Sequence, residues 1–151
     1  MKTWKSKDKS NWPVGVWQDE PDKAQWVDEE SGLDCLIVRG PSGSLCGYVG
    51  VPESHNCFKK DYYDVEVDVH GGLTFSDLCS EPEKVESNVC HTGEVANDIV
   101  WWLGFDTAHS EDYTPKHGFH QYEWERGQTY KTLNYVKREV TSLAKQLGVI
   151  L

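Results

Sequence analysis

The amino-acid sequence predicts an α+β fold: a single compact domain with a mostly antiparallel sheet and a C-terminal amphipathic helix packed on it. Three observations support this prediction. Apolar, β-branched runs recur through the middle of the chain, two of them are joined by a short turn rich in glycine and serine, and the clearest helical periodicity comes last. Strands followed by a helix are typical of the α+β class.

The chain length fits one domain. Its 151 residues, 38% of them hydrophobic, can build one substantial core, whereas two halves would each be marginal. Residues 1–16 are expected to be a flexible N-terminal segment, because Lys, Ser, Asp and Asn alternate there with Trp without any period. Residues 17–151 then form the predicted domain.

The first expected elements are a helix and a hairpin. Residues 22–30 are predicted to form a short helix, since a proline precedes them and a glycine follows. Residues 33–39 and 45–51 are predicted to be antiparallel strands, because the five residues between them have a turn composition.

The later segments complete the sheet and add the helix. Residues 64–70 alternate valines with polar side chains, which predicts a half-buried strand, and residues 80–94 are expected to be a polar surface excursion. The nearly continuous apolar run 99–105 is typical of a central strand covered on both faces. Between residues 130 and 147, apolar side chains recur at three- and four-residue spacing, which predicts the amphipathic helix.

The charge balance limits the partners. Fifteen Lys and Arg against 25 Asp and Glu give a formal charge of −10, which repels duplex nucleic acid and anionic lipid. No stretch approaches the roughly 20 apolar residues of a membrane span, and no apolar segment follows the Lys-rich start to make a signal peptide. We therefore expect a cytoplasmic protein that binds neither duplex nucleic acid nor membrane.

The five cysteines are expected to be reduced thiols. They form no Cys-x-x-Cys pair, and an odd number in a cytoplasmic chain argues against a disulfide framework. A zinc site made of Cys79, Cys90 and His91 can be drawn, but its spacing does not fit a zinc knuckle.

Polar side chains gather after two of the predicted strands. Asp106, His109 and Asp112 are three residues apart, so on a helical turn or tight elbow they could converge, and His70 could join them from a neighbouring strand end. Such a group suits a divalent metal that acidifies a water, or acid–base catalysis by His70, His109 and Asp106. The alternative is that Asp106 and His109 merely cap the elbow while His70 lies at the surface.

A ligand could also be bound without being altered. The residues proposed to contact it are Arg39, Tyr48, His70, Trp102, Asp106 and His109. Arg39 follows an apolar run, where a guanidinium usually has an anionic partner, and within the fold Asp106 is the expected one. Tyr48 lies between two glycines that let a ligand approach the backbone. Trp101 and Trp102 must point to opposite faces of a strand, so one belongs to the core and the other could stack on a base.

Several enzyme classes are excluded by missing motifs. The sequence has no Walker loop, no dinucleotide-binding fingerprint and no Gly-x-Ser-x-Gly elbow. ATPase, Rossmann dehydrogenase and serine-hydrolase functions are therefore not expected.

A sequence signature runs through 32–39, 45–55, 69–75 with VHGGLTF, and 101–112 with WWLGFDTAH. With these segments the chain resembles a family of small uncharacterised proteins encoded by bacteriophages and bacterial genomes. Including 130–147, the resemblance covers roughly three quarters of the chain. It implies a phage accessory protein that acts inside a bacterial host cell, where such proteins often counter host defence, and it implies no established activity. The family's cysteine in the second motif is Thr107 here, which argues against an essential thiol or metal ligand at that position.

Three functions remain, of which the first two belong to different classes. We favour a binding protein, monomeric or homo-oligomeric, that sequesters a small anionic, nucleotide-like ligand, because seven tryptophans are present and no catalytic motif is complete. Such a protein needs a local positive patch. The alternative is a metal-dependent or His/Asp acid–base hydrolase of a nucleotide-like substrate. A third function is an acidic inhibitor that occupies a basic host protein.

Overall fold

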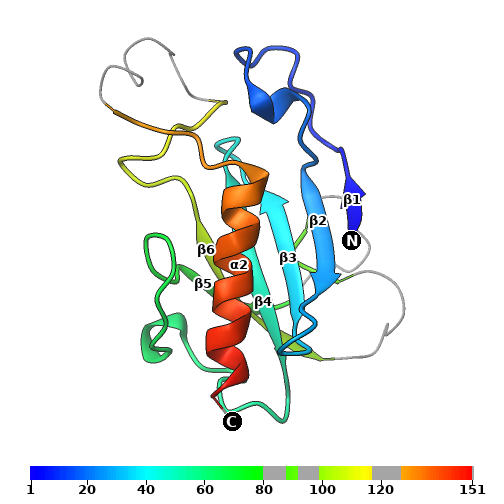
Figure 1. Cartoon of the computed structure of the whole chain (residues 1–151), viewed down its shortest axis with the longest axis vertical. Helices are drawn as coiled ribbons and strands as arrows, with labels where there is room; N and C mark the ends of the chain where they lie inside the picture. Colours follow the sequence, from blue (N-terminus) through cyan, green and yellow to red (C-terminus); the bar gives the residue numbers. More distant parts are fainter. Residues whose placement is uncertain (80–87, 92–98, 117–126, 151) are drawn as a thin grey trace.

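The computed structural model describes residues 1–79, 88–91, 99–116 and 127–150 (Figure 1). Within these residues, an antiparallel sheet of six strands has the order β1-β2-β3-β4-β6-β5. The strands are β1 (Lys2–Trp4), β2 (Lys23–Val27), β3 (Asp34–Arg39), β4 (Leu45–Pro52), β5 (Phe75–Leu78) and β6 (Val100–Asp106). The helical elements are η1 (Val16–Gln18), η2 (Tyr62–Asp64) and α2 (Leu133–Gly148).

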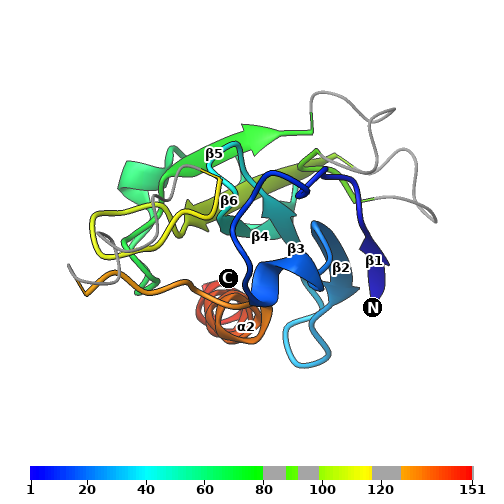
Figure 2. The same ribbon diagram turned by 90° about the horizontal axis from the view of Figure 1, so that it is seen from above.

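The helix α2 covers one face of the sheet, so the molecule has two layers (Figure 2). It begins at Thr132, whose hydroxyl accepts a hydrogen bond from the amide of Tyr135 at 3.2 Å. The side chains buried against β3 and β4 are Val136, Val140, Leu143, Ala144 and Leu147. The predicted α+β class is confirmed. In the described part of the chain, no helix has the length and apolar character needed to cross a membrane.

The hairpin and the central strand are also confirmed. Strands β3 and β4 pair antiparallel, with Arg39 opposite Leu45. Strand β6 is hydrogen-bonded to β4 on one side and to β5 on the other. Its two tryptophans point to opposite faces as predicted: Trp101 packs against the core under α2, and Trp102 belongs to the core of the other face.

The predicted helix at residues 22–30 is wrong, because Lys23–Val27 form strand β2 instead. This strand pairs with β1 on one side and with β3 on the other. The helix prediction used local signals only, a proline before the segment and a glycine after it. Two ladders of inter-strand hydrogen bonds outweigh these weak local preferences.

Regular structure begins at Lys2, well before Trp17, the residue at which the sequence predicts the domain to start. Strand β1 forms the edge of the sheet, and the carboxylate of Asp22 accepts hydrogen bonds from the amides of Ser6 and Lys7 at 2.8 and 2.9 Å. These contacts place part of segment 1–16 against the sheet.

The predicted strand at residues 64–70 is also wrong. Val65 and Val69 are buried as the alternation requires, but the segment pairs with no strand. Its backbone is held by α2 instead, since the amide of Asp68 donates to Gln146 at 2.7 Å. The polar excursion expected at residues 80–94 lies mostly outside the described residues.

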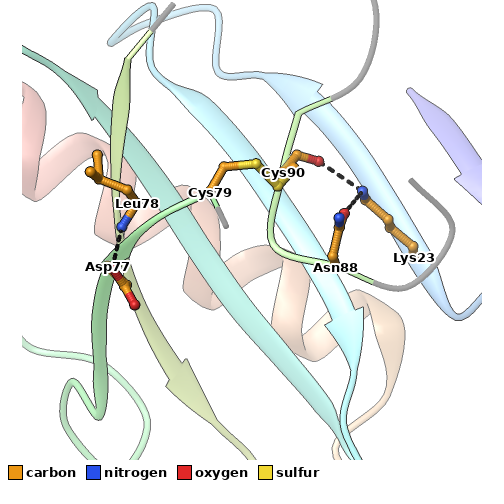
Figure 3. Close-up of a disulfide and its surroundings, with 6 residues drawn as sticks. All are labelled: Lys23, Asp77, Leu78, Cys79, Asn88 and Cys90. Atoms are coloured by element: carbon orange, nitrogen blue, oxygen red, sulfur yellow. Dashed lines mark hydrogen bonds between the residues drawn. A yellow bond between two sulfur atoms is a disulfide. The ribbon is translucent and has the colours of Figure 1, made fainter. Parts of the chain in front are cut away.

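A disulfide joins Cys79, just after β5, to Cys90 (Figure 3). The prediction of reduced thiols is therefore wrong for these two cysteines, whereas Cys35, Cys46 and Cys57 are free thiols as predicted. The buried ammonium of Lys23 donates a hydrogen bond to the carbonyl of Cys90 at 2.7 Å, and burial lowers the pKa of Lys23 to about 8. The same segment carries His91 over Trp102, with ring centroids 5.8 Å apart. Residues 88–91 therefore cover the sheet face opposite α2.

A buried ion network, made of Lys9, Glu20, Asp22, Arg39 and Tyr130, fixes the N-terminal segment. The carboxylate of Asp22 accepts a hydrogen bond from Arg39 Nε at 2.7 Å and lies 2.8 Å from the ammonium of Lys9. Arg39 also donates to the hydroxyl of Tyr130 at 2.8 Å. The predicted pairing of Arg39 with Asp106 is therefore wrong, because a carboxylate 17 residues earlier in the chain takes that place.

Candidate functional site

His70 sits on a glycine turn beside α2. Its backbone amide donates to Glu139 on the helix at 2.9 Å. Gly71 and Gly72 follow with φ angles of 68° and 79°, a left-handed conformation that side chains disfavour, and the amide of Gly72 closes the turn on the carbonyl of Val69. The turn therefore ends the extended segment and holds the imidazole at a fixed place.

Asp106, His109 and Asp112 lie on the elbow that follows β6. Asp106 accepts the amide of Ala108 at 3.0 Å, and Asp112 accepts the amide of His109 at 3.1 Å. The hydroxyl of Thr107 donates to the carbonyl of Leu45 at 2.8 Å and is buried. Asp106 thus caps the elbow, as the alternative predicted. The second capping side chain is Asp112, where the alternative named His109, and Asp112 in addition points at the histidines.

His70 is held on both ring nitrogens. Nε2 lies 2.9 and 3.0 Å from the two oxygens of Asp112, and Nδ1 lies 2.8 Å from the hydroxyl of Tyr135. Because an ionised carboxylate only accepts, Nε2 carries the proton; the hydroxyl of Tyr135 donates to Nδ1 when the ring is neutral and accepts from it when the ring is an imidazolium. The three side chains form one hydrogen-bonded chain across three segments.

His109 completes the site. Its ring centroid is 5.9 Å from that of His70, which confirms the prediction that both histidines lie at one end of the sheet. Its Nδ1 lies 3.3 Å from Asp106 and 3.5 Å from Asp112, yet this buried nitrogen makes no hydrogen bond to any residue that the structure describes. The ring stands directly on Gly71, because a Cβ there would lie 2.4 Å from Cε1 of His109.

Asp112 is the centre of charge in the site. Its side chain is 1% exposed and also binds the ammonium of Lys131 at 3.0 Å. Burial raises the pKa of Asp112, but hydrogen bonds from His70, from the amide of His109 and from Lys131 outweigh burial and hold the pKa below its ordinary value. Asp112 is therefore a carboxylate at neutral pH.

The arrangement can hold a cation or move protons. His70, His109 and Asp112 each offer one ligand atom, and these atoms lie within 4.8 Å of one another. Asp106 lies beside this group, with its Oδ1 3.3 Å from Nδ1 of His109. The side chains of His70 and His109 are 17% and 37% exposed, so a small molecule can reach both rings.

The other three predicted ligand contacts lie elsewhere. Arg39 belongs to the buried ion network and is 1% exposed, and Trp102 is 1% exposed on the face opposite α2. Tyr48 packs edge-on against Phe75 on that same face. Their burial removes them as stacking or phosphate contacts for a ligand at the histidines.

Tyr135 and Lys131 are members of the site that sequence reasoning missed. Tyr135 occupies the helix flank next to the buried stripe, where tyrosine is ordinary, and Lys131 precedes the helix. Their contacts join residues far apart in the chain, 65 apart for His70 and Tyr135. Neither has a local sequence signal, but the polar flank of the predicted helix was a place to look.

The thiols do not contribute a nucleophile. Burial raises the pKa of Cys46 to about 11 and that of Cys35 to about 12, so both remain protonated at neutral pH.

A basic hollow lies on the outer surface of α2, separate from the histidines. It has a volume of about 560 Å³ and is lined by Asn134, Lys137, Arg138, Thr141, Ser142 and Lys145. Three of these six side chains are cations, so this acidic protein does have a local positive surface.

In comparisons with known proteins, no family model matches the sequence, and no curated protein or solved structure is significantly similar to it.

Proposed function

We propose that the protein hydrolyses a small nucleotide-like substrate at the site formed by His70, His109 and Asp112. The observation that supports this proposal best is the convergence of two imidazoles from separate loops on one buried carboxylate. A carboxylate that orients an imidazole is the usual arrangement for activating water or a hydroxyl. The proposed activity therefore uses side chains that are already in place.

The balance between the two functions considered from the sequence changes with the geometry. The binding site was expected to use Arg39, Tyr48 and Trp102 together with His70, Asp106 and His109, and the first three side chains are buried in other parts of the fold. The residues expected to perform chemistry, by contrast, lie together. Hydrolysis is therefore the better supported proposal, and sequestration without turnover is the outcome that would replace it.

The nucleotide-like character of the substrate is part of the same proposal. Two histidines and Lys131 can each donate a hydrogen bond to a phosphate oxygen when protonated, and the cations of the α2 hollow add positive charge to this helix. Following the family resemblance, we propose that the protein is a phage accessory protein that degrades a host defence signal in the bacterial cytoplasm.

The test is an incubation of the protein with cyclic and linear nucleotides in large excess, followed by chromatography of the heat-denatured mixture. We expect several turnovers of at least one nucleotide, lost in His109→Ala. The matched control is His91→Ala, because His91 also lies near an aspartate, 3.6 Å from Asp34, but outside the site. Nucleotides bound yet returned intact would instead support sequestration, and neither binding nor turnover would support the acidic inhibitor.

A further inference from the structure

The ligand atoms of the site have the spacing of a metal coordination shell. Nε2 of His70 lies 2.9 Å from Asp112 Oδ2, Nδ1 of His109 lies 3.5 Å from the same oxygen, and Asp106 Oδ1 lies 3.3 Å from that nitrogen. Two ligands bound tetrahedrally to zinc at its usual bond lengths are about 3.4 Å apart. Small side-chain shifts would therefore suffice for all of them to reach one ion.

Nδ1 of His109 supplies an independent observation. This nitrogen is buried, faces two carboxylate oxygens and makes no hydrogen bond. A buried polar atom without a partner is costly and calls for a physical explanation. A cation between the nitrogen and the oxygens would satisfy the lone pair and neutralise the carboxylates together.

We propose that His70, His109 and Asp112, with Asp106 beside them, bind one divalent transition-metal ion of the zinc type. Imidazole nitrogens favour zinc and related ions, whereas magnesium and calcium take oxygen ligands. Tyr135 would hold the second nitrogen of His70, as outer groups do for metal-binding histidines. The three ligands leave a fourth position for Asp106 or a water.

Lys131 competes with the ion for Asp112. Its ammonium lies 3.0 Å from Oδ1, which Nε2 of His70 also approaches at 3.0 Å, while Oδ2 lies 2.9 Å from Nε2 of His70 and 3.5 Å from Nδ1 of His109. The two oxygens can therefore serve two cations, but the positive charges repel each other at close range. Removing the charge of Lys131 should strengthen metal binding, an effect that a merely structural lysine would not produce.

The proposal concerns the same site as the proposed hydrolase, but it is tested without substrate. The full chain is stripped of metal with a chelator, dialysed and titrated with Zn²⁺ by calorimetry in buffers of different ionisation enthalpy. We expect one ion per chain and no proton release from a neutral His70, because its Nε2 proton moves to Nδ1, which then donates to the hydroxyl of Tyr135. Mg²⁺ should give no comparable binding.

Variants locate the ion. His109→Ala should abolish stoichiometric binding, Tyr135→Phe should weaken it by about 10- to 100-fold, and Lys131→Met should tighten it by about tenfold. His91→Ala should leave it unchanged. Circular dichroism confirms that each variant is folded, and Co²⁺ loading should give ligand-field bands without the charge-transfer band of a thiolate.

Two results would overturn the metal site: no stoichiometric Zn²⁺ binding, or binding that His109→Ala leaves unchanged. These outcomes are distinct from failure of the hydrolase. Zn²⁺ binding at these residues without turnover of any nucleotide would support the metal site and contradict the hydrolase. Turnover by a protein that shows no stoichiometric Zn²⁺ binding would support the hydrolase and overturn the metal site.

Discussion

The histidine site, made of His70, Asp106, His109 and Asp112, and the buried ion network both combine carboxylates with basic side chains. They differ in how many of these groups have their hydrogen bonds made within the protein. In the network, Arg39 donates hydrogen bonds to Asp22, to Tyr130 and to two backbone carbonyls. The side chains of Arg39 and Asp22 are at most 1% exposed. In the histidine site, His109 is 37% exposed and its buried nitrogen makes no hydrogen bond.

The two clusters lie at the same end of the sheet, so position does not explain the difference. Arg39 on β3 is opposite Leu45, and Asp106 on β6 is opposite Cys46, which places β4 between them. A cluster that satisfies all its groups internally supports the fold. A cluster that leaves a group unsatisfied next to solvent has capacity left for a ligand.

The largest expected effect is on the network. Asp22→Ala leaves Arg39 buried without its carboxylate and should lower the free energy of unfolding by about 3–5 kcal/mol. Urea unfolding followed by tryptophan fluorescence measures it. A loss below about 1 kcal/mol, typical of exposed ion pairs, would erase the contrast between the two clusters.

Gly71→Ala should have the next largest effect. The left-handed backbone costs about 1–2 kcal/mol for a residue with a Cβ, and the new methyl group also displaces His109. Gly72→Ala is the matched control, because Gly72 has a similar φ but nothing within 4 Å of its Cβ position. Stability and turnover of the two variants are compared. Equal turnover in both would contradict a role for the contact between Gly71 and His109.

Acid unfolding should depend on Asp22. Burial raises its pKa, but hydrogen bonds from Lys9, from the amides of Lys7 and Ser6 and from Arg39 hold it below the ordinary value. A lowered folded pKa stabilises the fold above the unfolded pKa, near 3.9, and this contribution is lost as the pH falls through the folded value. Below about pH 5, the stability of Asp22→Asn should therefore decline less steeply than that of the wild type. Parallel curves would show that Asp22 does not contribute.

The smallest effect on stability is expected for His109→Ala. The side chain is more than one-third exposed and lacks a hydrogen bond at Nδ1, so the free energy of unfolding should change by no more than about 0.5 kcal/mol. Thermal unfolding measures this change, while turnover should be lost. A large loss of stability would make His109 a structural residue like Arg39.

The parts of the fold that sequence reasoning predicted are those encoded by local periodicity. The hairpin of β3 and β4, the central strand β6 and the helix α2 each carry their own apolar pattern. Strand β2 does not, because its position depends on pairing with β1 and β3. The disulfide was missed for a different reason, since the expected compartment argued against it and nothing in the sequence specifies the pairing.

The sequence likewise predicted only part of the candidate site. His70, Asp106, His109 and Asp112 were found because each follows an apolar run that ends in a polar turn. Tyr135 and Lys131 were not, since their roles depend on how α2 lies against the loops. Arg39 shows the limit most clearly: a buried partner was expected, but the spacing of residues could not tell Asp22 from Asp106.

The contact between Gly71 and His109 also has an evolutionary consequence. The imidazole of His109 packs directly on the Cα of Gly71, so the residue types allowed at these two positions depend on each other, although the positions lie in different loops and 38 residues apart. Any side chain at 71 would occupy the space of the imidazole, so homologous chains that lost the glycine should also have exchanged the histidine for something small. Covariation between positions 71 and 109 is therefore the trace that this packing should leave in an alignment.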